Sequence, residues 1–219
     1  MPFVARTVRV LGHDVPETLV ATWAIMIFLV VASRAAVRLM WSRPPEKAPS
    51  GTRLVPEIVY EAVQWLVDGA MGKERRGFIP YVGTLALFLL VANLTGLVGI
   101  TPPTADLNTT LALATITFMN IQYYSIRRKG LASYIKGFFD PVAFLAPLNV
   151  ISEIALPFSL AFRLFGNMLG GTIIMGLLYS VLPVVVPVLP HAYFDVFSGM
   201  VQTFIFVMLT MTFISRAMD

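Results

Sequence analysis

Long stretches without a charged residue dominate the hydrophobic pattern of this chain. Each is close to, or longer than, the about 20 residues that an α-helix needs to cross the hydrocarbon core of a bilayer. None has the period-two alternation of a membrane β-strand, and an unpaired backbone is costly in lipid. The pattern therefore predicts an all-α integral membrane protein with several transmembrane helices. The stretches are residues 18–33, 77–105, 107–126, 164–194 and 196–215.

The segment 54–72 has a different pattern, in which apolar pairs recur at helical spacing and polar residues fill the opposite side. This period is that of an amphipathic helix. We expect it to lie on the cytoplasmic surface of the bilayer, after a flexible linker at residues 42–51. Its polar side is formed by Glu57, Glu61, Gln64 and Asp68.

The composition agrees with a membrane protein. Hydrophobic residues make up 57% of the chain and charged residues 13%, whereas a soluble domain carries about 25% charge. A conventional soluble enzyme is therefore excluded. The basic residues behind the net charge of +4 lie at the ends of apolar stretches, so nucleic acid is not an expected partner. The chain has no Cys and only two distant His, His13 and His191, so we expect no disulfide, metal site or cofactor.

The distribution of Lys and Arg predicts the orientation in the membrane. Eight of them lie between the first two stretches and four after the third, but the turn at 101–106 has none. By the positive-inside rule the basic loops face the cytoplasm, which puts the amino terminus outside and the carboxy terminus in the cytoplasm. The single membrane domain 1–219 then divides into an outer segment (1–17), a first span (18–41), a cytoplasmic linker with the amphipathic helix (42–77), two further spans (78–127), a cytoplasmic loop (128–140) and a carboxy-terminal region (141–219).

Polar side chains interrupt the apolar stretches in the last third of the chain. Arg163 is the only charged residue between positions 154 and 194. A charge at the centre of a membrane helix costs about 2.5–3.5 kcal/mol on insertion scales, and a guanidinium keeps its proton in a protein. Arg163 must therefore face water or a carboxylate, which Glu153, Asp195 or a partner protein can supply. The other polar candidates are Asn149, Asn167, Thr172 and Gln202.

Helical geometry, at about 100° per residue, sorts these side chains by face. Thr172 falls on the side opposite to Arg163, while Asp195 and Gln202 share one face of the last helix. We expect the Thr172 face and the Asp195 face to meet and to enclose a polar path. Four residues lie within about 40° of Arg163, namely Ser152, Ser159, Asn167 and Gly170.

These residues also have purely structural alternatives. Arg163 and Glu153 could form a salt bridge, and the Thr172 hydroxyl could bond its own backbone. Asn167 and Gln202 could serve as hydrogen bonds between helices. Asp195 could cap a helix N-terminus.

The stretch from 159 to 168, SLAFRLFGNM, closely resembles the signature of subunit a of bacterial F-type ATP synthases. Residues 102–108 (PPTADLN) and 201–206 (VQTFIF) are also similar to that family, and the resemblance extends from about residue 12 to 217. It implies the stationary ion-translocating subunit of the bacterial inner membrane. The implied partners are the ring of c subunits, the peripheral stalk b subunits, other ATP synthase subunits and lipid. The region 141–219 would form a long tilted helical hairpin facing the ring.

The resemblance also implies residue roles. Arg163 matches the essential arginine, which would hold a ring carboxylate ionised and keep two offset half-channels apart. Thr172 stands where the family often has an acid or His, and Asp195 stands where it often has His or Glu. Asp195 would then act alone as the outer relay, with Thr172 holding water. The implied ion path comprises Asn149, Glu153, Ser159, Asn167, Thr172, Asp195 and Gln202.

Other functions lack the sequence features that they need. The chain has no GxxxxGK[ST] loop, HExxH or GxSxG motif, so we expect no catalytic site on it. A channel or transporter outside ATP synthase is an alternative, although the chain has no repeated halves. The expected coupling ion is H⁺, with Na⁺ as the alternative because Thr172 replaces an acid.

Overall fold

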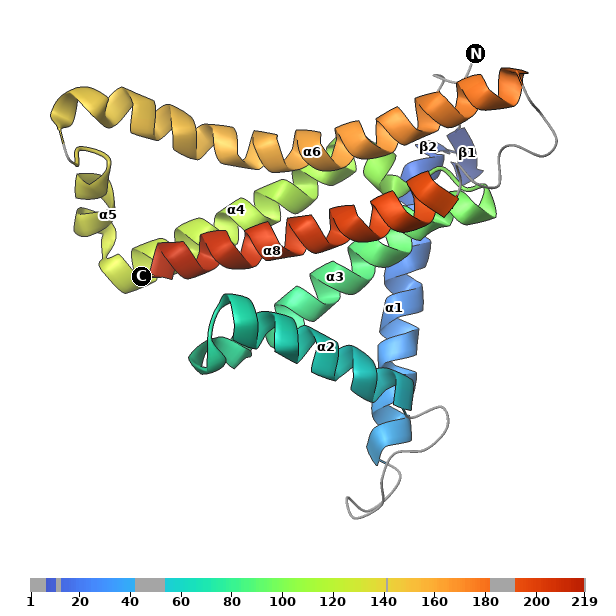
Figure 1. Cartoon of the computed structure of the whole chain (residues 1–219), viewed down its shortest axis with the longest axis horizontal. Helices are drawn as coiled ribbons and strands as arrows, with labels where there is room; N and C mark the ends of the chain where they lie inside the picture. Colours follow the sequence, from blue (N-terminus) through green and yellow to red (C-terminus); the bar gives the residue numbers. More distant parts are fainter. Residues whose placement is uncertain (1–6, 11–12, 42–53, 141, 182–191, 219) are drawn as a thin grey trace.

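A computed structural model describes residues 7–10, 13–41, 54–140, 142–181 and 192–218 of the 219-residue chain (Figure 1). Within these ranges the chain is almost entirely helical, which confirms the all-α class. The principal helices are α1 (Glu17–Trp41), α2 (Leu54–Ala70), α3 (Ile79–Leu94), α4 (Leu107–Lys129), α5 (Leu131–Gly137), α6 (Ala146–Val181) and α8 (Gly199–Met218). Short helical turns are η2 (Lys73–Phe78), η3 (Thr95–Val98), η4 (Pro103–Ala105), η5 (Ala143–Leu145) and the π-helical η6 (Ala192–Ser198).

A small β-hairpin precedes α1, and the sequence analysis did not anticipate it. Strands β1 (Thr7–Val10) and β2 (His13–Pro16) pair antiparallel, with Thr7 opposite Pro16. Arg9 and Asp14 face each other across the pair, with 3.4 Å between Arg9 Nε and Asp14 Oδ1. Both side chains are largely exposed, so this ion pair adds little to stability.

Four described helical stretches are long and apolar enough to cross a membrane. The most buried of them is Val196–Met218, in which 44% of the most apolar segment is buried by the rest of the chain. Lipid or partner proteins must therefore cover much of the apolar surface of these stretches. Helix α4, the predicted third span, has 23 residues but is not among the four, because threonines and amides dilute its apolar residues. The four stretches are Glu17–Arg38, Lys73–Val98, Ala146–Ser180 and Val196–Met218.

Helix α8 is at the centre of the core. Its residues Phe206, Met211 and Ile214 are fully buried, and α3, α4 and α6 contribute to the same hydrophobic cluster. Helix α2 adds Val63 and Val67 from one side only, whereas Trp65 is 75% exposed. This one-sided burial confirms that α2 is amphipathic.

A tight turn joins α2 to the next span. Gly72 has φ +89°, a conformation that glycine adopts without steric cost. Arg76 then folds back on α2, and its Nε and Nη2 atoms donate to the two carboxylate oxygens of Asp68 at 2.9 and 2.6 Å. This bidentate pair keeps η2 against the end of α2.

Helix α6 is continuous over 36 residues and passes through Pro157. It begins well before the apolar run at 164–194 that the sequence marks. At 1.5 Å per residue it is about 54 Å long, which exceeds the about 30 Å hydrocarbon core. A helix of this length fits inside the core only when it is strongly tilted, and Figure 1 shows α6 and α8 both running across the direction of α1.

Candidate functional site

Arg163 lies on the outward side of α6. Its neighbours Leu160, Ala161 and Leu164 are buried at 2% exposure or less, because they pack into the core with α8. Arg163 itself is exposed, and so are the adjacent Phe162 and other apolar residues of the same surface. The cation is therefore presented on a largely apolar helix face.

The carboxylates of the described residues do not neutralise Arg163. Within the part of the chain that the structure describes, the ion pairs are Arg9–Asp14 and Arg76–Asp68. The structural alternative, a salt bridge to Glu153, is not formed. Glu153 instead accepts a hydrogen bond of 2.6 Å from Gln122 Nε2 of α4, and ten residues of helix place it about 15 Å from Arg163 along the axis.

Asn167 connects α6 to η6. Its Nδ2 donates to Ser198 Oγ at 3.0 Å, and the Ser198 hydroxyl lies 3.2 Å from Asn167 Oδ1. Hence α6 and η6 meet through polar groups. The face involved differs from the expected one, because Asn167 is on the Arg163 side of α6.

Thr172 does not take part in this contact. Its exposed side chain donates to Met168 O at 2.9 Å, which is the backbone bond named as its structural alternative. The neighbouring Gly171 approaches η6 instead, since a Cβ there would lie 3.6 Å from Phe194. A meeting of the Thr172 face with the Asp195 face stays a prediction, because the Asp195 side chain lies outside the described part.

Gln202 lies one turn after Ser198 on the same side of α8. It is 6% exposed, and its Nε2 has no hydrogen-bond partner in the described structure. An unsatisfied buried donor costs about 1–3 kcal/mol, so this amide is available to an acceptor that enters the site. Asp195 belongs to η6, but its side chain is outside the described part, and its relay role stays a prediction.

A buried polar cluster that the sequence analysis missed fixes the start of α8. Asn93 Nδ2 donates to Gly199 O at 3.1 Å and to Thr203 Oγ1 at 3.0 Å, and Thr104 Oγ1 donates to Asn93 Oδ1 at 2.7 Å. Asn93 and Thr104 are fully buried. The sequence signal for this cluster is the amide of Asn93 inside an apolar run. Its hydrogen-bond partners could not be predicted, because they come from two other segments of the chain. The cluster positions the turn of α8 that carries Gln202.

The remaining candidates lie around the other end of α6. Asn149 Nδ2 donates to Phe138 O at 2.9 Å and to Asp140 O at 3.3 Å, so its observed contacts close the corner between α5 and α6. Ser159 is exposed one turn before Arg163. Tyr134 of α5 lies near Glu153, and burial is the main cause that raises the pKa of its phenol, with the Glu153 charge second.

The described residues contain no group of three or more His, Asp or Glu side chains placed to hold a metal ion. Within the described part of the chain, the groups of the site are the Arg163 guanidinium, which has no ion pair there, the unsatisfied Gln202 amide, and neighbouring hydroxyl and carboxyl groups.

Comparison with known proteins identifies the family. A sequence model of the family described as "ATP synthase A chain" matches residues 18–215. This chain belongs to the ATP synthase A chain family. It is the ion-translocating stator subunit of the membrane sector and carries no catalytic site of the complex. The alternative of a channel or transporter outside ATP synthase is thereby set aside.

Individual relatives match over nearly the whole chain. "ATP synthase subunit a" of Moorella thermoacetica is 40% identical, over 91% of this chain and 89% of the relative. "ATP synthase subunit a, sodium ion specific" of Propionigenium modestum is 38% identical, over 94% of this chain and 75% of the relative. The protein of Citrifermentans bemidjiense is also 38% identical, over 93% and 88%.

Proposed function

We propose that Arg163 is the group through which this subunit couples ion flow to rotation of the c-subunit ring. The observation that carries the proposal is its placement. Arg163 is exposed on an apolar face of α6, and no carboxylate of the described chain is paired with it. A fixed cation on a membrane helix needs a counter-charge, and a carboxylate on an adjacent ring would provide it.

The physical chemistry of such a pair explains the coupling. A ring carboxylate surrounded by lipid prefers its neutral form, and an opposite charge within reach favours the ionised form. A ring site therefore loses its proton where it meets Arg163 and regains one before it moves back into lipid. Each charge that crosses about 100 mV supplies about 2.3 kcal/mol, so several ions are needed for each ATP.

Two half-channels would approach Arg163 from opposite directions along α6. Asn167, bonded to Ser198, lies four residues after the arginine, and Gln202 follows Ser198 on α8. Glu153, bonded to Gln122, lies ten residues before it, toward the basic end of α4. We assign the Asn167 side, with Asp195 and Thr172, to the outer path. Glu153, with Asn149 and Ser159, belongs to the cytoplasmic path.

The same proposal includes the setting of the subunit. The amino terminus lies outside, the carboxy terminus lies in the cytoplasm, and the protein spans the bacterial inner membrane. Its partners are the c ring, the peripheral stalk b subunits, the other ATP synthase subunits and lipid. The α6–α8 hairpin is the tilted surface that faces the ring.

ATP-driven pumping in vesicles tests the proposal. We expect Arg163→Ala to abolish acidification of vesicles that contain the complete synthase. Arg34→Ala is the matched control, because Arg34 is an exposed arginine of α1 without a place in the proposed path. Pumping that survives Arg163→Ala would overturn the assignment.

Na⁺ is the second candidate for the coupling ion, and two observations favour it. The Propionigenium modestum relative is named as sodium ion specific, and Thr172 offers a neutral hydroxyl in place of an acid. The two ions are distinguished by ATP-driven ²²Na⁺ uptake in the presence of a protonophore. Uptake that persists identifies Na⁺, and its absence together with protonophore-sensitive acidification identifies H⁺.

A further inference from the structure

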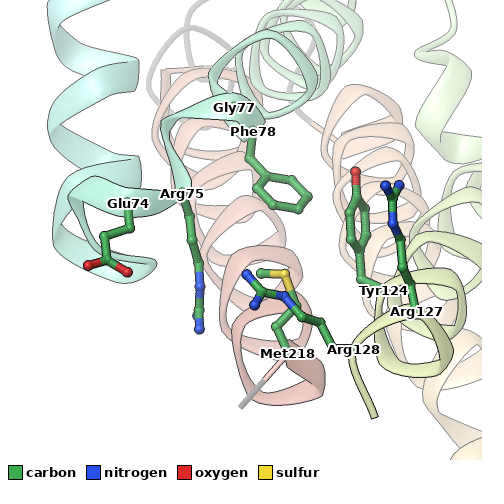
Figure 2. A pocket seen from close by; sticks show the side chains of 8 residues that line it. All are labelled: Glu74, Arg75, Gly77, Phe78, Tyr124, Arg127, Arg128 and Met218. Atoms are coloured by element: carbon green, nitrogen blue, oxygen red, sulfur yellow. The ribbon is translucent and has the colours of Figure 1, made fainter. Parts of the chain in front are cut away.

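A pocket of about 410 Å³ lies where the ends of three segments meet, η2, α4 and α8. Figure 2 shows Arg75 entering from η2 and Arg127 and Arg128 from the end of α4, around the ring of Phe78. None of these side chains belongs to the proposed ion path. The lining is completed by Glu74, Gly77, Tyr124 and Met218.

The described lining of the pocket has an excess of positive charge. Among these residues three are arginines and one, Glu74, carries a carboxylate. Arg75 donates to Ser215 O at 3.4 Å and to the Ser215 hydroxyl, which ties the pocket to the end of α8. Arg128 is exposed and forms no ion pair within the described residues. Its guanidinium is available to an anion.

Arg127 is held in place beside the pocket. Its Nη1 donates to Tyr123 Oη at 2.9 Å, and its guanidinium carbon lies 5.8 Å from the centre of the Tyr123 ring. The guanidinium keeps further donors that can contact a phosphate oxygen. A planar fork of this kind suits phosphate recognition.

The inner wall of the pocket is apolar. The rings of Phe78 and Tyr124 are in edge contact, with their centres 4.7 Å apart, and Met218 lies on the α8 side. The ligand that fits such a site has an anionic head and an apolar body. A free inorganic anion would use only the arginines.

The position of the pocket matches the boundary of a membrane. One candidate span begins at Lys73 and another ends at Met218, and α4 ends at Lys129. The start of η2 and the end of α4 are rich in Lys and Arg, and α8 ends with Arg216, which marks the cytoplasmic side. Anionic phospholipids give that leaflet its negative surface potential, and basic pockets between transmembrane helices bind their head groups.

We propose that this pocket binds the phosphate head group of an anionic phospholipid from the cytoplasmic leaflet. Arg128 and Arg127 hold the phosphate oxygens, and Phe78, Tyr124 and Met218 contact the glycerol and the first acyl carbons. The bound lipid would join η2, α4 and α8 at their ends. This role goes beyond ion translocation and does not depend on it.

Photo-crosslinking of the complete synthase in nanodiscs tests the proposal. The probe is phosphatidylglycerol with a diazirine near the glycerol end of one acyl chain, compared with the same probe in phosphatidylcholine. We expect the anionic probe to label peptides that contain Tyr124 or Met218. Arg128→Gln should reduce this labelling about fivefold, because one basic residue near the membrane surface contributes about 1 kcal/mol to the binding of anionic lipid. The matched control is Lys129→Gln, which removes the same charge from the next residue, outside the pocket.

Three results would overturn the proposal. Equal labelling by phosphatidylcholine would show that the pocket does not select anionic lipid. Equal effects of Arg128→Gln and Lys129→Gln would show a general surface charge effect. Displacement of the probe by millimolar inorganic phosphate would assign the arginines to a free phosphate. Labelling of Tyr124 or Met218 that depends on Arg128 and withstands phosphate would support it.

Discussion

Asn93 is the side chain through which α3 and the turn before α4 hold the first turn of α8. Asn93→Ala removes three hydrogen bonds, to Gly199 O, Thr203 Oγ1 and Thr104 Oγ1. Polar bonds between membrane helices contribute about 0.6 kcal/mol each on average, which gives about 2 kcal/mol for the three. The Thr104 hydroxyl also loses its buried acceptor, at about 1 kcal/mol or more.

We therefore expect Asn93→Ala to lower the free energy of unfolding by about 3 kcal/mol. The measurement is unfolding of the full chain in detergent micelles by titration with sodium dodecyl sulfate, followed by circular dichroism. The control is Asn120→Ala, because the hydrogen bond from Asn120 Nδ2 to Ile116 O, at 2.9 Å, stays within one helix. That control should lose less than about 1 kcal/mol.

A double-mutant cycle with Thr203→Ala separates the bond from general disruption. The 3.0 Å contact predicts a coupling energy of about 0.6–1.7 kcal/mol between Asn93 and Thr203. If Asn93→Ala costs no more than Asn120→Ala, or if the coupling is zero, the cluster does not hold α8 in the way described here.

The other predictions concern pH, close packing and the outer path. The hydrogen bond from Arg76 is the main cause that holds the pKa of Asp68 below its ordinary value of 3.8. In the same unfolding assay, wild type should therefore be more stable than Asp68→Asn above pH 3.8, and this difference should disappear as the pH falls through the lowered pKa. Gly199→Ala places a Cβ 3.1 Å from Asn93 Cβ and should cost about 1–3 kcal/mol. Gly176→Ala, with no atom within 4 Å of the new Cβ, should change stability by less than about 1 kcal/mol. Asp195→Asn should slow proton flux through vesicles more than Thr172→Ala does, and the reverse order would remove Asp195 from the outer relay.

Hydrophobic spacing was sufficient to predict the helices and the amphipathic character of α2. The apolar runs are long, and the burial of Val63 and Val67 follows directly from the spacing of that segment. Helix α6 begins before the apolar run at 164–194. Burial of Leu160, Ala161 and Leu164 compensates for the hydrogen bond that Pro157 removes from the helix.

The pairing of helix faces was harder to predict. Spacing along one helix says which side chains share a face, but it does not say which face a second helix will contact. The close approach of Gly171 to Phe194 sets that rotation and brings Asn167, not Thr172, to Ser198. The Asn93 cluster was missed for the same reason, because its partners come from distant segments. The counter-charge of Arg163 was left open between Glu153, Asp195 and a partner protein, and among these the described structure shows Glu153 bonded to Gln122 instead.

Passive proton conductance tests whether Arg163 keeps the two proposed half-channels apart. The measurement uses sealed vesicles that contain the complete synthase, without ATP, and follows the collapse of an imposed pH gradient. We expect Arg163→Ala to collapse the gradient faster than wild type and Arg34→Ala, because protons can then pass from one path to the other without rotation. Arg163→Ala vesicles that hold the gradient as well as wild type would contradict the claim.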